Sequence, residues 1–277
     1  MLFKKYKIQF FILFFILFLL ILWYFYTNFF LKNYEIFDNL SSKNIFFLKN
    51  INCKDYFKDN FYKIFKESEM TIKNLYVRNV NSLEEYYEKT LNSCLDFSNF
   101  EKQYIISLIQ NYIQPWFFLN KNKNILSYYN INVNKLISIP WIFIKMSKDY
   151  ENGLPHTLQS NVISVSPNFF KKDKISNIKT LIHERIHIYQ KENKEEMNKY
   201  LLEYFIKIYN PILKKQGRKN PDLDEYLYKN KLTNILYYSK FNSSNPKSLL
   251  DVKYPNNNEY LEHPLEEMAY TIEHTYK

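Results

Sequence analysis

An uncharged apolar run near the N-terminus constrains this chain most. The segment from Ile8 to Leu31, IQFFILFFILFLLILWYFYTNFFL, contains no charged residue, and it is longer than the roughly 20 residues with which a helix crosses a bilayer. The alternative, a cleaved signal peptide, would have a shorter apolar core followed by a site with small residues. This run ends in bulky side chains instead. We therefore predict an uncleaved anchor, with residues 1–32 as the cytoplasmic N-terminus and transmembrane helix.

The charges around this run predict its orientation. Lys4, Lys5 and Lys7 precede it, while Lys32 behind it is soon followed by acidic residues. Positive charge collects on the cytoplasmic side of a membrane segment, so we expect the N-terminus in the cytoplasm. The rest of a single-pass protein of this kind would then lie in a lumen, outside the cell or on the outside of a viral envelope.

Two cysteines, Cys53 and Cys94, are compatible with such a compartment. In an oxidising lumen they could form one disulfide, whereas in the cytosol they would stay separate buried thiols. The sequence leaves both outcomes open.

The formal charge of +10 suggests a nucleic-acid partner at first sight. Without the three lysines ahead of the anchor, 35 basic residues face 28 acidic ones, and the two signs are interspersed along the chain. No glycine-rich phosphate loop, zinc knuckle or aromatic RNA-binding motif accompanies them. We therefore expect no nucleic-acid partner.

Hydrophobic periodicity divides the rest of the chain. From 33 to 135 the apolar residues recur mostly at three- and four-residue steps, as in FEKQYIISLIQNYIQPWFFL, which is typical of amphipathic helices. The stretches Ile137–Met146 and Asn161–Ser166 are rich in β-branched residues and bounded by turn signals, so they are predicted strands. The expected fold class is α+β, with a mostly helical region before a domain at 136–277 that contains a small sheet.

A helix with a polar motif follows the second predicted strand. The stretch ISNIKTLIHERIHIYQ places apolar side chains at helical spacing and offers Ser176 as an N-cap. His183 and His187 are four residues apart, so both imidazoles leave one helix face, a spacing that suits two ligands of one tetrahedral zinc ion. Glu184 follows the first histidine, where its carboxylate can reach a water at the metal. The motif predicts two zinc ligands and a general base.

A catalytic zinc ion normally takes three protein ligands and leaves a fourth position open. The pattern H-E-x-x-H-x-x-G-x-x-H does not supply the third, because Gln190 and Asn193 occupy its later positions. The best candidate segment is EHPLEEMAYTIEH, predicted as a helix with Pro264 in its first turn. Four side chains of this segment qualify as the third ligand: Glu266, Glu267, His263 and His274.

HERIHIYQ followed far downstream by HPLEEMAY resembles the gluzincin zinc metallopeptidases, in which H-E-x-x-H pairs with a Glu of an E-x-x-A pattern on a second helix. The resemblance implies three zinc ligands and a general base, respectively His183, His187, Glu266 and Glu184. Ala269 is then the small residue of E-x-x-A, and Tyr270 follows where many members have Asp. With PHT and KNPD, the series is similar to uncharacterised metallopeptidase-like proteins of large DNA viruses and some microbial eukaryotes. The resemblance covers roughly Ile137 to the C-terminus.

Three more residues are candidates for the site. His156 and Thr157 precede the strand that edges the substrate cleft in zincin-like folds, so His156 is a candidate for contacts with the substrate or the oxyanion. Tyr270 is a second candidate for the oxyanion. Asp222, in RKNPD, is a candidate to orient a ligand histidine from the second shell, although Asn-Pro-Asp is also a good turn.

Together these features predict a membrane-anchored zinc metallopeptidase that acts on peptides or proteins through a zincin-like catalytic domain. The alternative is a membrane-anchored structural or binding protein whose zinc site is vestigial or structural. A structural site would close the fourth metal position with another Cys or His.

Overall fold

The structure is a computed structural model that describes residues 44–66, 70–120, 124–159, 161–224 and 226–277. The predicted anchor, Ile8 to Leu31, lies outside the described residues. Within the described ranges, no helix is both long and apolar enough to cross a membrane.

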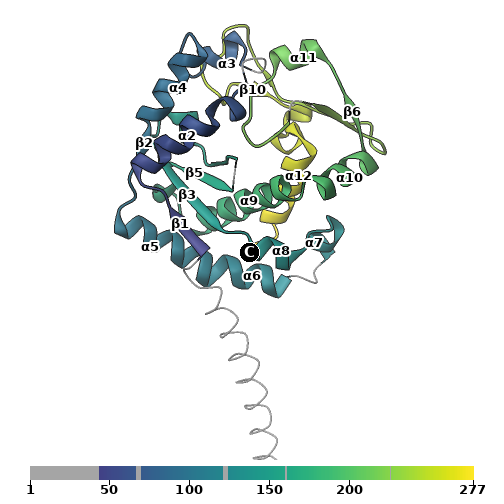
Figure 1. Ribbon diagram of the computed structural model, residues 1–277. Coiled ribbons are helices and arrows are strands. Elements are labelled where there is room, and N and C mark those ends of the chain that lie inside the picture. The colour runs from purple at the N-terminus through teal and green to yellow at the C-terminus, as the bar shows by residue number, and fades with distance from the viewer. Residues whose placement is uncertain (1–43, 67–69, 121–123, 160, 225) are drawn as a thin grey trace, which may run out of the picture. The chain divides into compact units, whose positions relative to one another are not determined.

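The largest sheet of the described residues has five strands (Figure 1). They are β1 (Ile45–Phe47), β2 (Cys94–Leu95), β3 (Trp141–Met146), β4 (His156–Thr157) and β5 (Val162–Val165). The order is β1-β3-β5-β4, and β2 pairs with the far end of β3. Strand β3 is parallel to β1 and β5, whereas β4 is antiparallel to β5. Strand β4 is therefore an edge of the sheet.

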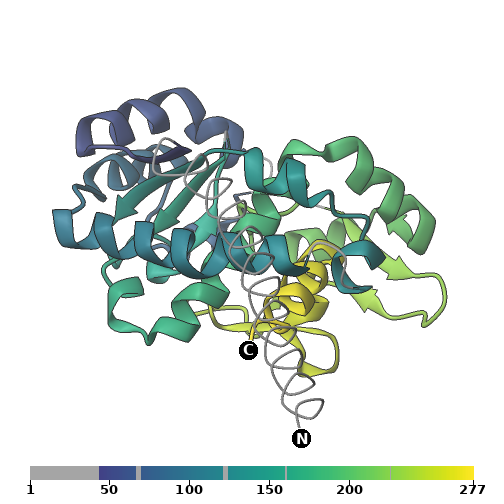
Figure 2. The same ribbon diagram turned by 90° about the horizontal axis from the view of Figure 1, so that it is seen from below.

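Both faces of this sheet are buried under helices (Figure 2). Along β3, Trp141 and Phe143 belong to one hydrophobic core and Ile144 and Met146 to another, as the alternation of side chains along a strand requires. The first core is completed by α5 (Asn99–Leu108), α6 (Gln114–Asn120), α8 (Val133–Ser138), α9 (Lys174–Glu192) and α12 (Pro264–Glu273). The second is completed by α2 (Asn50–Ile64) and α4 (Leu83–Asn92).

The described residues also form further α-helices and two small sheets. The other α-helices are α3 (Ile72–Tyr76), α7 (Asn124–Tyr128), α10 (Lys194–Tyr204) and α11 (Pro211–Gln216). Two small antiparallel sheets are formed by β6 (Phe205–Ile208), β7 (Leu227–Asn230) and β8 (Leu236–Tyr237), and by β9 (Lys240–Phe241) and β10 (Val252–Lys253). A π-helical turn, Ile109–Ile113, joins α5 to α6.

The expected α+β class is confirmed as a mixture of helices and small sheets. Strand β5 lies inside its predicted range, but β3 begins only at Trp141, because Ile137 and Ser138 end helix α8. The region 33–135 contributes two strands, β1 and β2, to the sheet of the following region. Residues on both sides of the predicted boundary near residue 135 therefore belong to one sheet and share a hydrophobic core.

A disulfide joins Cys53 of α2 to Cys94 of β2, with the two Cα atoms 6.0 Å apart. This is one of the two outcomes that the sequence left open. The bond links a helix covering one face of the sheet to a strand within that sheet.

Candidate metal centre

Two helices bring the predicted ligands together. His183 and His187 lie one turn apart on α9, and Glu266 lies in the first turn of α12. Pro264 occupies the start of α12, as predicted. The two helices pack against each other, and the side chain of Ala269 on α12 is fully buried in the common core, where its small size permits a close approach.

Helix α9 begins earlier than its predicted N-cap. Asp173, not Ser176, caps it: the backbone N–H of Ser176 donates to Oδ1 of Asp173 at 2.9 Å, and the Ser176 hydroxyl donates to Oδ2. The predicted cap residue thus lies inside the first turn. A carboxylate accepts two hydrogen bonds more readily than a hydroxyl can, and Asp also suits the positive end of a helix.

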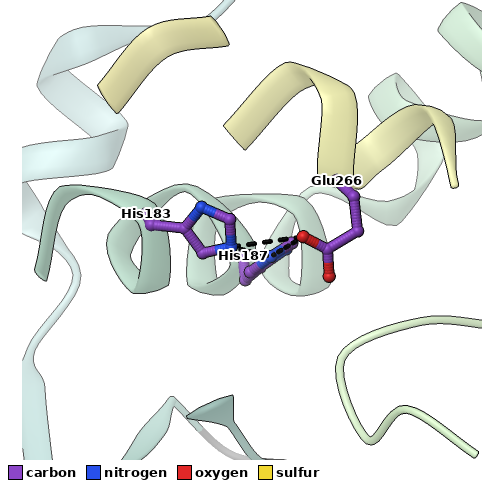
Figure 3. Close-up of side chains that lie close together, drawn as sticks. All are labelled: His183, His187 and Glu266. Carbon is purple, nitrogen blue, oxygen red and sulfur yellow. Dashed lines mark hydrogen bonds and ion pairs between the residues drawn. The ribbon is translucent and has the colours of Figure 1, made fainter. Parts of the chain in front are cut away.

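Three donor atoms converge on one point (Figure 3). Nε2 of His183 lies 3.2 Å from Oε2 of Glu266, and Nε2 of His187 lies 3.5 Å from the same oxygen. The two Nε2 atoms are 3.0 Å apart. Atoms bound ~2.0–2.1 Å from a tetrahedral zinc ion lie roughly 3.3 Å from one another. The cluster therefore has the dimensions of a metal site, although other divalent ions fit such donors as well.

The outer nitrogens of both imidazoles face acceptors. Nδ1 of His187 is 2.7 Å from the amide oxygen of Gln190, and Nδ1 of His183 is 3.2 Å from a carboxylate oxygen of Glu273. A proton on each Nδ1 suits these contacts and leaves a lone pair on each Nε2. The two lone pairs then face each other and the Glu266 carboxylate, which is repulsive unless a cation lies between them. These three donor atoms are therefore stable at such short distances only with a metal ion or extra protons between them.

The charges of the cluster agree with this conclusion. Burial disfavours a charged His183, but the carboxylates of Glu266 and Glu273 outweigh burial and raise the pKa of His183 well above its ordinary value. Burial also disfavours a charged Glu266, yet His187 and His183 hold the pKa of this carboxyl well below its usual range. A buried carboxylate that stays ionised between two imidazoles attracts a cation.

Two amide side chains contact the candidate ligands or the helix that carries them, and neither contact was predicted from the sequence. Asn220 donates to the second carboxylate oxygen of Glu266 at 3.1 Å, which leaves Oε2 to face the histidines. Gln190 donates to the carbonyl oxygen of Leu265 at 3.0 Å while its own oxygen faces His187. A signal existed for Asn220, since it lies in the KNPD stretch. Gln190 stands three residues after His187, on a buried face of α9.

Glu184 is buried beside the cluster but is not one of its three ligands. Its Oε2 accepts a hydrogen bond from the hydroxyl of Thr157 at 2.8 Å. Burial first, and the charge of Asp222 second, raise the pKa of Glu184 to about 7. A carboxyl group with this pKa can accept a proton and return it near neutral pH.

Asp222 does not occupy the place predicted for it. Its side-chain contacts are with Thr157, whose backbone N–H donates to Oδ1 at 2.7 Å, and with Lys191, whose Nζ lies 3.3 Å from the same oxygen. It therefore binds the edge strand β4 rather than a ligand histidine. Its influence on the site is electrostatic, because its charge contributes to raising the pKa values of both Glu184 and His187.

The other candidate residues discussed for the site lie on α12 or at its ends. The rings of Tyr270 and His183 pack edge to face, with the ring centroids 4.6 Å apart. Glu267 faces away from the cluster and accepts a hydrogen bond from Tyr237. His263 and His274 lie at the two ends of α12 and take no part in the cluster. Of the four side chains that qualified as the third ligand, Glu266 alone joins His183 and His187.

A cavity of about 270 Å³ opens beside the cluster. His183, Glu184 and Glu266 reach it, and so do His156 of β4 and Tyr270 of α12. A ligand in this cavity would therefore be adjacent to Glu184 and to two of the three residues of the cluster. The chain itself matches no described protein family, no curated protein and no solved structure.

Proposed function

We propose that this protein is a zinc-dependent metallopeptidase that hydrolyses peptide bonds, anchored in a membrane by Ile8 to Leu31. The observation that carries the proposal is the convergence of three donor atoms, beside a buried Glu184, at the wall of an accessible cavity. A small mixed sheet packed beside the motif-bearing helix is also compatible with a zincin-like domain.

The residues of the cluster fit a zinc ion. Two imidazole nitrogens and one carboxylate oxygen, from His183, His187 and Glu266, are a ligand set of catalytic zinc sites. Acceptors beside the outer nitrogens usually orient such histidines; here Gln190 lies at hydrogen-bonding distance from Nδ1 of His187, and a carboxylate oxygen of Glu273 lies 3.2 Å from Nδ1 of His183. When bound, zinc supplies Lewis acidity: it lowers the pKa of a water and polarises the carbonyl group of an amide.

Glu184 performs the proton transfers. Its carboxylate takes a proton from the water as the water oxygen attacks the carbonyl carbon. It then gives this proton to the nitrogen of the leaving amine as the C–N bond breaks, so the products are a carboxylic acid and an amine. The hydroxyl of Thr157 fixes the carboxylate through its hydrogen bond to Oε2.

Two features favour this function over a structural or vestigial zinc site. A structural site would recruit a fourth Cys or His, but the cluster found among the described residues contains three ligands. Cys53 and Cys94 are bonded to each other. In addition, the cavity that His183 and Glu266 line is also lined by Glu184, so a base and space for a ligand adjoin the cluster.

The test combines metal analysis with a peptide library. The full chain, purified in mild detergent, should hold one zinc ion per molecule, and it should cleave members of a pool of end-blocked octapeptides. Chelation should stop cleavage and added zinc should restore it. A chain that binds no metal, or that cleaves equally well after complete removal of metal, would refute the proposal.

A further inference from the structure

The outer side of strand β4 is closed by side chains rather than by another strand. Within the described sheet β4 pairs with β5 alone, so the backbone groups on its other side need different partners. At Thr157 the backbone N–H donates to Oδ1 of Asp222 at 2.7 Å, and Nζ of Lys191 donates to the backbone carbonyl oxygen. Both polar backbone groups of Thr157 are thus held by side chains.

The ammonium group of Lys191 is used entirely within the fold. Besides the contact with Thr157, it donates to the carbonyl oxygen of Pro221 at 3.2 Å and lies 3.3 Å from Oδ1 of Asp222. An ammonium group has three donor protons, and each has an acceptor here. The side chain is only 18% exposed, and a lysine is rarely buried to this extent without such partners. Lys191 therefore joins parts of the protein to each other.

These contacts hold the hydroxyl of Thr157 in place. This hydroxyl lies 2.8 Å from Oε2 of Glu184 and 3.0 Å from the backbone carbonyl oxygen of the same residue. Lys191 follows Glu184 by seven residues on α9, so the two side chains leave the same side of the helix. Strand β4 is therefore bound to α9 at two points, two helical turns apart.

Resting on the proposed function, we propose that Lys191, together with Asp222, is a positioning residue for the general base. The two side chains hold the backbone of Thr157, so that its hydroxyl stays bonded to Glu184 and keeps the carboxylate in one orientation. Lys191 does not line the cavity beside the cluster, so it acts through Thr157. A carboxylate that can rotate spends less time in the orientation that accepts a proton, so turnover falls while substrate and zinc still bind.

Steady-state kinetics of Lys191→Met separate positioning from binding. Methionine fills the space of the lysine stem but donates no hydrogen bond. We expect kcat on a cleaved octapeptide to fall about tenfold, the value of one hydrogen bond, with KM and zinc content unchanged. The control is Lys194→Met, because Lys194 is exposed and lines the same cavity of about 410 Å³ as Lys191. Wild-type kcat in Lys191→Met overturns the proposal.

A double-mutant cycle with Thr157→Val tests how the effect reaches the base. Valine keeps the shape of threonine and removes its hydroxyl. If Lys191 acts through that hydroxyl, Lys191→Met lowers kcat about tenfold in the wild-type background and has no further effect in the Thr157→Val background. A general structural role predicts equal losses in both backgrounds, and that result would contradict the proposal.

Chemical rescue covers the case in which Lys191→Met folds poorly. Both cysteines of the chain are in the disulfide, so Lys191→Cys introduces the one free thiol. Its reaction with 2-bromoethylamine forms a C–S bond, releases bromide and restores a side chain of lysine's length that ends in an ammonium group. Iodoethane adds no ammonium group and is the control. With complete alkylation verified by mass spectrometry, kcat should recover with the first reagent only; recovery with both or with neither refutes the positioning role.

Hydrogen exchange gives a readout that needs neither zinc nor cleavage. In the metal-free full chain, the amide of Thr157 should exchange about tenfold faster in Lys191→Met than in wild type, while the amide of Ile163 on β5 should be unchanged. Equal exchange at Thr157 in a chain that cleaves peptides contradicts this proposal alone. A wild-type chain without zinc or cleavage refutes the proposed function, and the positioning role with it, even if Thr157 is protected.

Discussion

The amide oxygen of Gln190 lies 2.7 Å from Nδ1 of His187. The same amide donates to the carbonyl oxygen of Leu265, one residue before Glu266. A single side chain therefore selects the tautomer of one proposed ligand and fixes the distance to the helix that carries another.

We expect Gln190→Ala to weaken zinc binding by about 10–100-fold, the usual loss when such a supporting contact is removed. Competition with a chromogenic chelator measures the affinity. Gln103→Ala, an exposed substitution on α5, is the control and should leave affinity unchanged. Wild-type affinity in Gln190→Ala would show that this contact does not orient His187.

Glu266→Ala should reduce zinc affinity by more than about 100-fold, because a ligand is lost rather than a supporting contact. Glu267→Ala is the matched control on the same helix. Its carboxylate accepts a hydrogen bond from Tyr237, so its loss should lower the stability of the fold and leave the zinc affinity unchanged. Zinc titration of both variants measures the two affinities. A greater loss in Glu267→Ala than in Glu266→Ala would place the third ligand at Glu267.

Glu184→Gln should keep zinc bound while kcat on a verified peptide falls about 10²–10⁴-fold, because an amide cannot accept the proton of the attacking water. Metal content and steady-state kinetics are measured on the same preparation. Turnover near the wild-type rate would mean that another group is the base.

The ion pair between Arg78 and Glu151 should contribute strongly to stability. Its side chains are 1% and 6% exposed, so Arg78→Met leaves a buried carboxylate uncompensated and should cost about 3–5 kcal/mol in the free energy of unfolding. Denaturant unfolding of the variant and the wild type measures the difference. A loss below ~1 kcal/mol would mean that solvent reaches this carboxylate.

The ion pair between Arg78 and Glu151 also predicts how the free energy of unfolding depends on pH. Burial raises the pKa of Glu151, but Arg78 outweighs burial, and the pKa in the folded protein lies below its usual value. The stability gained from the charged carboxylate is therefore complete above the unfolded value of ~4.3 and is lost as pH falls through the lower, folded pKa. The difference in unfolding free energy between wild type and Glu151→Gln should shrink with acidification below about pH 4. A difference that grows instead would mean that folding raises, rather than lowers, the pKa of Glu151.

The topology prediction can be tested in sealed microsomes. A C-terminal tag should survive added protease until detergent opens the vesicles, because the lysines before Ile8 favour a cytoplasmic N-terminus. In the same sample, Cys53 and Cys94 should react with a maleimide only after reduction, as expected for a disulfide in an oxidising lumen. A tag digested in intact vesicles would contradict the orientation.

Local patterns in the sequence predicted the parts of the site that lie on single elements. The helical spacing of His183 and His187 is a property of one helix, and Pro264 marks the start of another. The resemblance to a known motif, rather than any spacing, singled out Glu266. That its carboxylate lies beside the two imidazoles is a fact about how α9 and α12 pack.

What the sequence could not predict depends on contacts between distant segments. Strands β1 and β2 are 3 and 2 residues long, too short for a periodic pattern, and both pair with β3 along the edge opposite β5. Asp222 was expected at a histidine and lies instead at Thr157. A turn motif indicates that the chain reverses, but it does not indicate which side chain the turn will face.

The proposed metal ligands come from two helices that are far apart in the chain. The disulfide and the complete ligand set can therefore form at different times during synthesis. Cys53 and Cys94 both precede the ligands, so their bond can close while the ribosome is still translating α9. Glu266 follows His183 by roughly 80 residues, which takes roughly 4–16 s at ~5–20 residues per second. During that interval the nascent chain can already contain the disulfide while the third donor has not yet been made. A chain interrupted in this window lacks Glu266 and the rest of α12, so the proposed hydrolytic activity would arise only after most of the polypeptide has been translated.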